Sequence, residues 1–251
     1  MSEPRAAAVP VVLGVLTVLI FAALVALGTW QIKRLFWKLD LIERVEQRVR
    51  AAPVASPGAE RWAQLTRQTD EYRHVRVTGT FLPHSTTLVQ AVTDLGSGFW
   101  LLTALRTLDG TVVLVNRGYV PSVETASALK KRESDRGQDR VIVTGLLRIS
   151  EPGGGLLRKN DPAAERWYSR DVQAIAMARG LSGAAPYFID REAAQNAPAD
   201  DPVGGLTVVS FSNNHLVYAL TWYALALMVA AGGLWAARYE TRLPNQSSQS
   251  R

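Results

Sequence analysis

Hydrophobic residues gather in two long uncharged stretches, one near each end of the chain. The stretches cover residues 6–32 and 203–237. A helix needs about 20 apolar residues to cross the hydrocarbon core of a bilayer, and each stretch contains that length. We therefore predict two transmembrane helices, at 9–32 and 213–237, with one folded region between them.

Aromatic side chains mark both ends of the second stretch. They are Tyr218, Trp222 and Tyr223 near its start, and Trp235 and Tyr239 near its end. Tryptophan and tyrosine are enriched at the two membrane–water interfaces, because their rings are apolar and their edges are polar. This placement favours a membrane-spanning helix over a helix in the core of a soluble protein.

The first stretch has a competing interpretation as a cleaved signal peptide. Such a peptide has an apolar region of about 7 to 15 residues preceded by a basic segment. Here the apolar run is longer, and the preceding segment has only Arg5, which is offset by Glu3. We therefore favour a retained membrane anchor.

The orientation of the spans follows from the basic residues beside them. Those residues are Lys33, Arg34 and Lys38 after the first span, and Arg238 and Arg242 after the second. The first group argues for a cytoplasmic central domain and the second for cytoplasmic termini. Long connecting domains cross the membrane largely regardless of their charge. We predict a cytoplasmic N-terminus (1–8), a cytoplasmic tail (238–251) and a central domain outside the cytoplasm.

A helical pattern continues beyond the first span, over residues 33–50. Apolar side chains recur at helical spacing, at Leu35, Leu39, Ile42, Val45 and Val49. Asp40 with Arg44, and Glu46 with Arg50, form potential i,i+4 ion pairs on the polar face. The pattern predicts an amphipathic helix that packs against the domain or lies on the lipid surface.

Strand patterns dominate residues 51–212. Residues 72–81 alternate apolar and polar positions, with Val75, Val77 and Phe81 on one side. Asp109-Gly110 separates two further strands, 100–108 and 111–119, and predicts a hairpin with a type I′ turn. We also predict strands at 141–149, 187–190 and 206–211, a helix at 171–179 ended by Gly180, a linker at 51–60, and exposed loops at 130–140 and 195–205.

Together these elements predict a membrane α+β protein. Two transmembrane helices flank a mostly antiparallel, barrel-like β domain that contains one or two helices and lies outside the cytoplasm.

Composition supports a folded, membrane-attached chain. Hydrophobic residues make up 47% and charged residues 20%, with a net charge of +6. The basic residues are spread along the chain, so we predict the lipid bilayer and not nucleic acid as their partner. The sequence has no cysteine. Disulfides, thiolate metal sites and covalent haem attachment through cysteine are therefore excluded.

Residues able to carry out catalysis are scarce. The chain has three histidines, and it lacks both the nucleophile-elbow motif G-x-S-x-G and the zinc motif H-E-x-x-H. His74 lies on the polar side of a predicted strand and His84 in a loop, so we expect both to be exposed to solvent. We predict no catalytic residues and no enzymatic activity.

His215 differs because it lies at the start of the second span. Tyr218 and Trp222 follow on the same helical face. A neutral imidazole can be an axial ligand of haem iron, and neighbouring aromatic rings can shield a porphyrin. Alternatively, the histidine faces lipid headgroups, while Ala219, Ala226, Ala230 and Gly233 let the two helices approach closely.

Three sequence motifs resemble those of the surfeit locus protein 1 family, whose members are assembly factors of cytochrome c oxidase. The first covers residues 27–34 (LGTWQIKR) with 37–42 (WKLDLI), the second covers 115–121 (VNRGYVP), and the third covers 213–223 (NNHLVYALTWY). Their order and the two-span architecture resemble the family along nearly the whole chain.

The resemblance implies a multi-pass protein of the bacterial inner membrane, with its β domain in the periplasm. It implies a chaperone of the respiratory chain that binds haem a transiently and helps deliver it to the oxidase catalytic subunit. His215 would be the axial iron ligand. Haem a synthase is a second potential partner.

Further residues are candidates for contact with the haem. Tyr218, Trp222 and Trp30 could contact the ring, and Trp30 with Gln31 could face His215 across the helix pair. Arg117 could pair with a propionate, as could Lys33 and Arg34. The competing interpretation makes Arg117 a turn-stabilising residue and makes the cations near the first span interface anchors.

Two other functions remain open. The main alternative is a structural assembly scaffold for the oxidase, in which His215 packs between the helices and no cofactor binds. The third is a membrane-anchored enzyme or sensor, which would need a catalytic group or a signalling domain.

Overall fold

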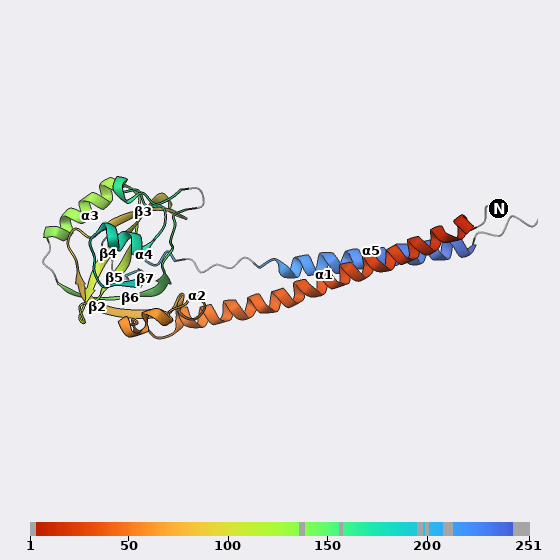
Figure 1. The fold of residues 1–251 in the computed structure, drawn as a ribbon, viewed down its shortest axis with the longest axis horizontal. Helices are drawn as coiled ribbons and strands as arrows, with labels where there is room; N and C mark the ends of the chain where they lie inside the picture. Colours follow the sequence, from red (N-terminus) through yellow and green to blue (C-terminus); the bar gives the residue numbers. More distant parts are fainter. Residues whose placement is uncertain are drawn as a thin grey trace, which may run out of the picture. The chain divides into compact units, whose positions relative to one another are not determined.

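The computed structural model describes residues 4–135, 139–155, 158–194, 198, 201–207 and 213–242. The chain divides into two compact units (Figure 1). The helical unit comprises Met1–Arg44 and Ser210–Arg251, and the β domain comprises Val45–Val209.

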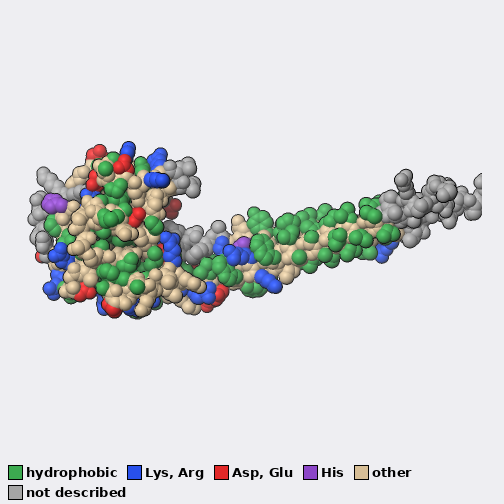
Figure 2. Space-filling model, in the orientation of Figure 1, with side chains coloured by type: hydrophobic (Ala, Val, Ile, Leu, Met, Phe, Trp, Pro, Cys, Tyr) green, Lys and Arg blue, Asp and Glu red, His purple; other side chains and the backbone are tan. Residues whose placement is uncertain are grey.

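The helical unit contains α5 (His215–Arg242) and most of α1 (Pro4–Arg50), whose last residues, from Val45, belong to the β domain. Both helices are long and apolar enough to cross a membrane. Apolar side chains cover much of the pair (Figure 2), and residues such as Val18 and Leu227 are 66% and 70% exposed. An apolar surface of this extent is unfavourable in water, whereas lipid would cover it.

Helix α1 continues without a break through the amphipathic segment at 33–50. Its polar face carries the two expected ion pairs, Asp40 with Arg44 at 2.8 Å and Glu46 with Arg50 at 3.7 Å. Both pairs are exposed, so each stabilises the helix by less than about 1 kcal/mol.

The β domain is a closed barrel. Its strands are β1 (Val54–Ala55), β2 (His74–Phe81), β3 (Thr87–Thr93), β4 (Gly96–Thr107), β5 (Val112–Val120), β6 (Arg140–Ile149) and β7 (Ala184–Arg191). They are ordered β1-β2-β6-β7-β5-β4-β3, and an additional β2–β4 pairing closes the ring. The pairs β1–β2 and β5–β7 are parallel and the others antiparallel, which confirms a mostly antiparallel, barrel-like domain.

Short helices complete the β domain. They are η1 (Ala59–Gln64), α2 (Arg67–Asp70), α3 (Val123–Asp135), η2 (Pro162–Ala164) and α4 (Val172–Ala178). Helix α4 matches the predicted helix at 171–179. The Asp171 side chain caps its first turn by accepting a hydrogen bond from the Ala174 amide, and Gly180 follows with φ +63°.

Strand β5 is buried on both faces, because the sheet has a hydrophobic cluster on each side. Val113 and Val115 belong to a cluster with Tyr187. The alternating residues Val112 and Leu114 belong to a second cluster, which includes Trp167, Val172, Ile175 and Phe188. Helix α4 supplies part of the second cluster and so covers that face of the sheet.

The predicted hairpin is present between β4 and β5, but its turn is not type I′. Gly110 has φ +84°, whereas Asp109 does not adopt a positive φ. The Gly110 amide donates to the Thr107 carbonyl at 3.1 Å, so the turn has a longer loop that ends in one left-handed glycine. Asp109 instead accepts hydrogen bonds from Thr107 and Thr111, which hold the pKa of its carboxyl below the ordinary value.

Other parts of the sequence-based secondary structure were wrong or incomplete. Strands β1 and β3 were not predicted, and β1 lies within the predicted linker. Helix α3 occupies the first part of the predicted loop at 130–140. Residues 206 and 207 of the predicted strand 206–211 are not in a strand, and the remainder lies outside the described residues.

Candidate functional site

His215 is the first residue of α5, and its imidazole contacts α1. Its Nδ1 lies 2.7 Å from Oε1 of Gln31. A carboxamide oxygen accepts hydrogen bonds and cannot donate them, so Nδ1 donates and carries the hydrogen. Among the residues that the structure describes, none hydrogen-bonds Nε2 of His215. The half-buried ring therefore presents one nitrogen with a lone pair.

A second contact between the helices lies close to the first. Thr29 Oγ1 and the Tyr223 hydroxyl are 3.1 Å apart. A Cβ atom on Gly28 would lie 2.8 Å from Cε1 of Tyr223, so the glycine leaves room for the tyrosine ring. The Gly28-Thr29 and Tyr223 parts of the two helix motifs therefore contact each other directly.

Small residues continue the antiparallel helix contact along α5. Ala219 and Ala226 are 1% and 2% exposed. A Cβ atom on Gly233 would lie 2.8 Å from Cγ2 of Thr17. The expectation that small residues on α5 allow close approach is confirmed at these three positions, as is usual for helices that pack in a membrane.

The predicted aromatic residues lie outside the closest helix contact. Tyr218 and Trp30 are 54% and 57% exposed, and Trp222 is half-buried. Gln31 is the described residue that hydrogen-bonds His215. Tyr218 and Trp222 follow His215 by about one and two turns of α5, so their rings offer accessible aromatic surface beyond the histidine.

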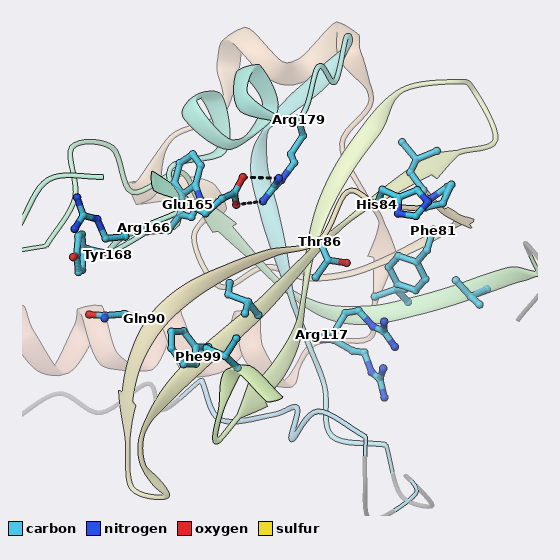
Figure 3. A pocket seen from close by; sticks show the side chains of 18 of the residues that line it. Phe81, His84, Thr86, Gln90, Phe99, Arg117, Glu165, Arg166, Tyr168 and Arg179 are labelled. Atoms are coloured by element: carbon cyan, nitrogen blue, oxygen red, sulfur yellow. Dashed lines mark hydrogen bonds and ion pairs between the residues drawn. The ribbon is translucent and has the colours of Figure 1, made fainter. Parts of the chain in front are cut away.

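Arg117 belongs to the other unit, near the end of β5. Its guanidinium carbon lies 5.0 Å from the centre of the Phe81 ring, which is the distance of a cation–π contact. Both residues line a cavity of about 910 Å³ in the β domain (Figure 3). The role of Arg117 toward a haem propionate stays a prediction.

The motif around Arg117 has a structural explanation. Asn116 Nδ2 donates to Asp190 at 2.8 Å, and its Oδ1 accepts from the Gly118 amide at 3.2 Å. Gly118 has φ +137°, and a Cβ atom there would lie 2.5 Å from the Val203 carbonyl. The Tyr119 and Val203 backbones exchange two hydrogen bonds of 2.9 Å. The motif therefore holds the returning chain against β5.

A buried ionic cluster surrounds Asp190, which is 4% exposed. Its carboxylate accepts hydrogen bonds from Arg148 at 2.8 Å, Arg170 at 3.2 Å and Thr207 at 2.8 Å, in addition to Asn116. Burial alone would lower the pKa of the Arg148 guanidinium, but Asp190 and Glu71 raise it above its ordinary value. With its charges compensated, the cluster fits a structural role better than a catalytic one.

The cavity in the β domain also contains an ion pair. Arg179 binds Glu165 through two nitrogens and donates from Nε to Thr87 at 2.9 Å (Figure 3). Arg179, Glu165 and Thr87 therefore each have a hydrogen-bond partner within this group. Within the described parts of the chain, no group of three or more His, Asp or Glu residues could hold a metal ion.

The other two histidines have different surroundings. His84 is exposed at φ +56°, as expected for the loop. His74 was expected to be exposed, but its side chain retains only 13% exposure. Its Nδ1 lies 2.6 Å from the Ala51 carbonyl, and its Nε2 lies 2.6 Å from Glu192. The start of the linker, at Ala51, and the chain after β7 cover this side of β2, which alternation along one strand could not reveal.

The hydrogen bonding of the His215 imidazole suits an axial ligand of haem iron. Histidines that bind metals usually donate their second N–H to an acceptor, which orients the ring and leaves the other nitrogen for the metal. Gln31 supplies that acceptor. A single imidazole is sufficient for axial haem ligation, so a cluster of acidic residues is not required.

Comparisons with known proteins extend over both units. The model of the SURF1 family matches residues 18–227, which include Gln31, Arg117 and His215. Surfeit locus protein 1 of Mus musculus is 35% identical over 243 residues, covering 90% of this chain and 75% of that protein. The protein of the same name in Homo sapiens is 33% identical over 231 residues, with coverages of 85% and 73%. A SURF1-like protein of Monosiga brevicollis is 35% identical over 217 residues, with coverages of 82% and 80%.

Proposed function

The chain belongs to the SURF1 family, and from this premise we propose that it is an assembly factor for a haem-copper cytochrome c oxidase. In this proposal the protein binds haem a and helps deliver it to the catalytic subunit of the oxidase. It acts as a chaperone of respiratory-chain assembly and not as an enzyme.

The contact between His215 and Gln31 carries the proposal. It leaves His215 Nε2 available as the axial iron ligand, while Tyr218 and Trp222 on the same helix would contact the ring. Haem a supplies an iron centre that an imidazole nitrogen can coordinate. The chain supplies the ligand, its orientation and an apolar environment.

Delivery to a partner requires release as well as binding. A carrier that offers a single axial imidazole can give up its cargo to a subunit that binds it more tightly, because the equilibrium follows the difference between the two affinities. The oxidase catalytic subunit is the proposed acceptor, and haem a synthase is the proposed source.

We assign the protein to a bacterial inner membrane, with both termini in the cytoplasm and the β domain in the periplasm. Two helices that are long and apolar enough to span a bilayer support this assignment. A haem site at the start of α5 would then lie near the periplasmic membrane surface.

The visible spectrum of the protein tests haem binding. Full-length protein purified in detergent from cells that make haem a should show a Soret band. His215→Ala should remove or shift that band, whereas His84→Ala, the same substitution at an exposed histidine of the β domain, should leave it unchanged. Absence of the band from the wild type, or an identical band in His215→Ala, would rule out the ligand assignment.

A structural scaffold for the oxidase is the second candidate function. The close packing of small residues between α1 and α5 would serve a scaffold equally well. A scaffold would purify without haem. If a deletion strain then still made haem a but lacked assembled oxidase, the scaffold would be the better description.

A further inference from the structure

We propose that Gln31 is a positioning residue that fixes the tautomer of His215 and thereby selects Nε2 as the iron-binding nitrogen. The inference rests on the proposed haem function for its purpose. The tautomer itself is a property of the protein without haem.

The first step is the direction of the hydrogen bond. Gln31 Oε1 lies 2.7 Å from Nδ1, and an amide oxygen can only accept. The bond therefore stabilises the neutral imidazole with its hydrogen on Nδ1. Without an acceptor at Nδ1, both neutral tautomers are accessible, and the hydrogen can occupy Nε2 and block the lone pair that a metal needs.

The second step is the fixed position of the acceptor. Thr29 lies two residues before Gln31 on α1 and hydrogen-bonds Tyr223, and Gly28 packs against the ring of that tyrosine. Sliding α1 by one turn, about 5.4 Å, would break both helix contacts. The helix register therefore keeps Gln31 opposite His215, where its carboxamide reaches the imidazole.

The third step is the environment of the bond. Both side chains are half-buried where the helices meet, so water competes for the imidazole less than at a fully exposed site. A hydrogen bond to the second nitrogen also increases the basicity of the ligating nitrogen. Gln31 should therefore affect the strength and the redox behaviour of iron ligation, beyond any effect on packing.

Nitrogen NMR of the histidine side chains in the haem-free, full-length protein tests the tautomer directly. The His215 signals are assigned by comparison with His215→Ala. We expect a protonated Nδ1 and an unprotonated Nε2 in the wild type, and a mixed or reversed tautomer in Gln31→Leu. Thr221→Val removes only an exposed hydrogen bond to the Val217 carbonyl within α5 and retains Gln31, so this control should keep the wild-type tautomer. A hydrogen on Nε2 in the wild type would overturn the inference, even if Gln31→Leu fails to fold.

Titration with haem a tests the consequence for binding. Loss of an outer partner of a metal-bound histidine typically weakens binding about 10-fold to 100-fold, which is the decrease expected for Gln31→Leu. Gln31→Glu retains an acceptor and adds negative charge, so it should preserve binding and shift the iron midpoint potential to lower values. Wild-type affinity and potential in both variants would overturn the inference.

The outcomes separate this inference from the proposed function. If the wild type binds no haem a, the proposed function fails. The NMR measurement on the haem-free protein still decides whether Gln31 fixes the His215 tautomer. If His215 ligates haem but Gln31→Leu behaves as wild type, only the role of Gln31 fails.

Discussion

Tyr187 shows how one side chain connects the sequence to the stability of the β domain. It lies in β7 with 0% exposure, and its hydroxyl donates to the Pro57 carbonyl at 2.9 Å. Burial raises the pKa of this hydroxyl from 10.0 to about 12, because the phenolate would lose its hydration. The folded protein therefore retains the proton at a pH where the unfolded chain releases it.

The raised pKa predicts a loss of stability in alkali. Below pH about 10 both states are protonated and Tyr187 adds no pH dependence. Between pH about 10 and 12 the unfolded state deprotonates first, so the free energy of unfolding falls by up to about 2.7 kcal/mol. Denaturant unfolding of the full chain across this range should show the decline, and Tyr187→Phe should reduce its slope. An equal slope in the two proteins would contradict the assignment.

At the scale of residues, sequence patterns identified local features better than long-range partners. The helix at 171–179 and its end at the left-handed Gly180 could be predicted because helix ends have local chemical requirements, whereas the capping role of Asp171 was not predicted. The Gln31–His215 contact is confirmed as a pairing across the helices, whereas Trp30 proved exposed. The Asp190 cluster was missed, because Asn116, Arg148 and Arg170 come from separate segments that only the strand order brings together.

The same limit applies to whole elements. Helix α3 has a strongly charged sequence, which suggested a loop. However, its Ala126 and Leu129 pack against Leu101 and Val120, so a few buried positions suffice to anchor it. The face of α5 that packs against α1 was also only partly predictable. Tyr218 was placed on the functional face with Trp222, yet packing against α1 buries the Ala219 side and leaves Tyr218 exposed.

The helix pairing can be tested with a disulfide, because the chain contains no cysteine. A Cβ atom built on Gly233 lies 4.0 Å from Cβ of Thr17, within the range of about 3.5–4.5 Å found in disulfides. Mild oxidation of the Thr17→Cys/Gly233→Cys double variant should therefore make both thiols unreactive toward maleimide.

A matched pair of positions controls for random collision. Val18 is 66% exposed, and a Cβ atom on Gly232 would meet nothing within 4 Å. Val18→Cys/Gly232→Cys should keep its thiols reactive under the same oxidation. Equal protection of the two pairs would contradict the observed helix register.

At the scale of the whole molecule, the two apolar helices and the barrel-like domain were predictable, because each leaves a periodic pattern in the sequence. The order of the strands was not. The parallel β5–β7 pair and the β2–β4 closure join strands through backbone hydrogen bonds, and alternation of apolar residues does not specify which strand is the neighbour.

Membrane orientation is the prediction that belongs to the entire chain. Val92 is 86% exposed on β3, so Val92→Cys provides a single accessible thiol in the β domain. In intact spheroplasts, a membrane-impermeant maleimide should label this variant without lysis. Ser2→Cys, in the N-terminal segment, should react only after lysis. The reverse pattern would place the domain in the cytoplasm.

The closure of the barrel has a consequence for its internal motions. Strands β2 and β4 join through only three residue pairs, at 79–81 with 105–107, whereas β2 and β6 pair from 74 to 80. Local unfolding follows the route that breaks the fewest hydrogen bonds and exposes the least apolar surface. The β2–β4 edge is therefore where the ring would part first, with its backbone amides exchanging hydrogen before those of β2–β6. The barrel would then open at this one strand pairing into a curved sheet. Water could enter its interior while the remaining strands stay paired.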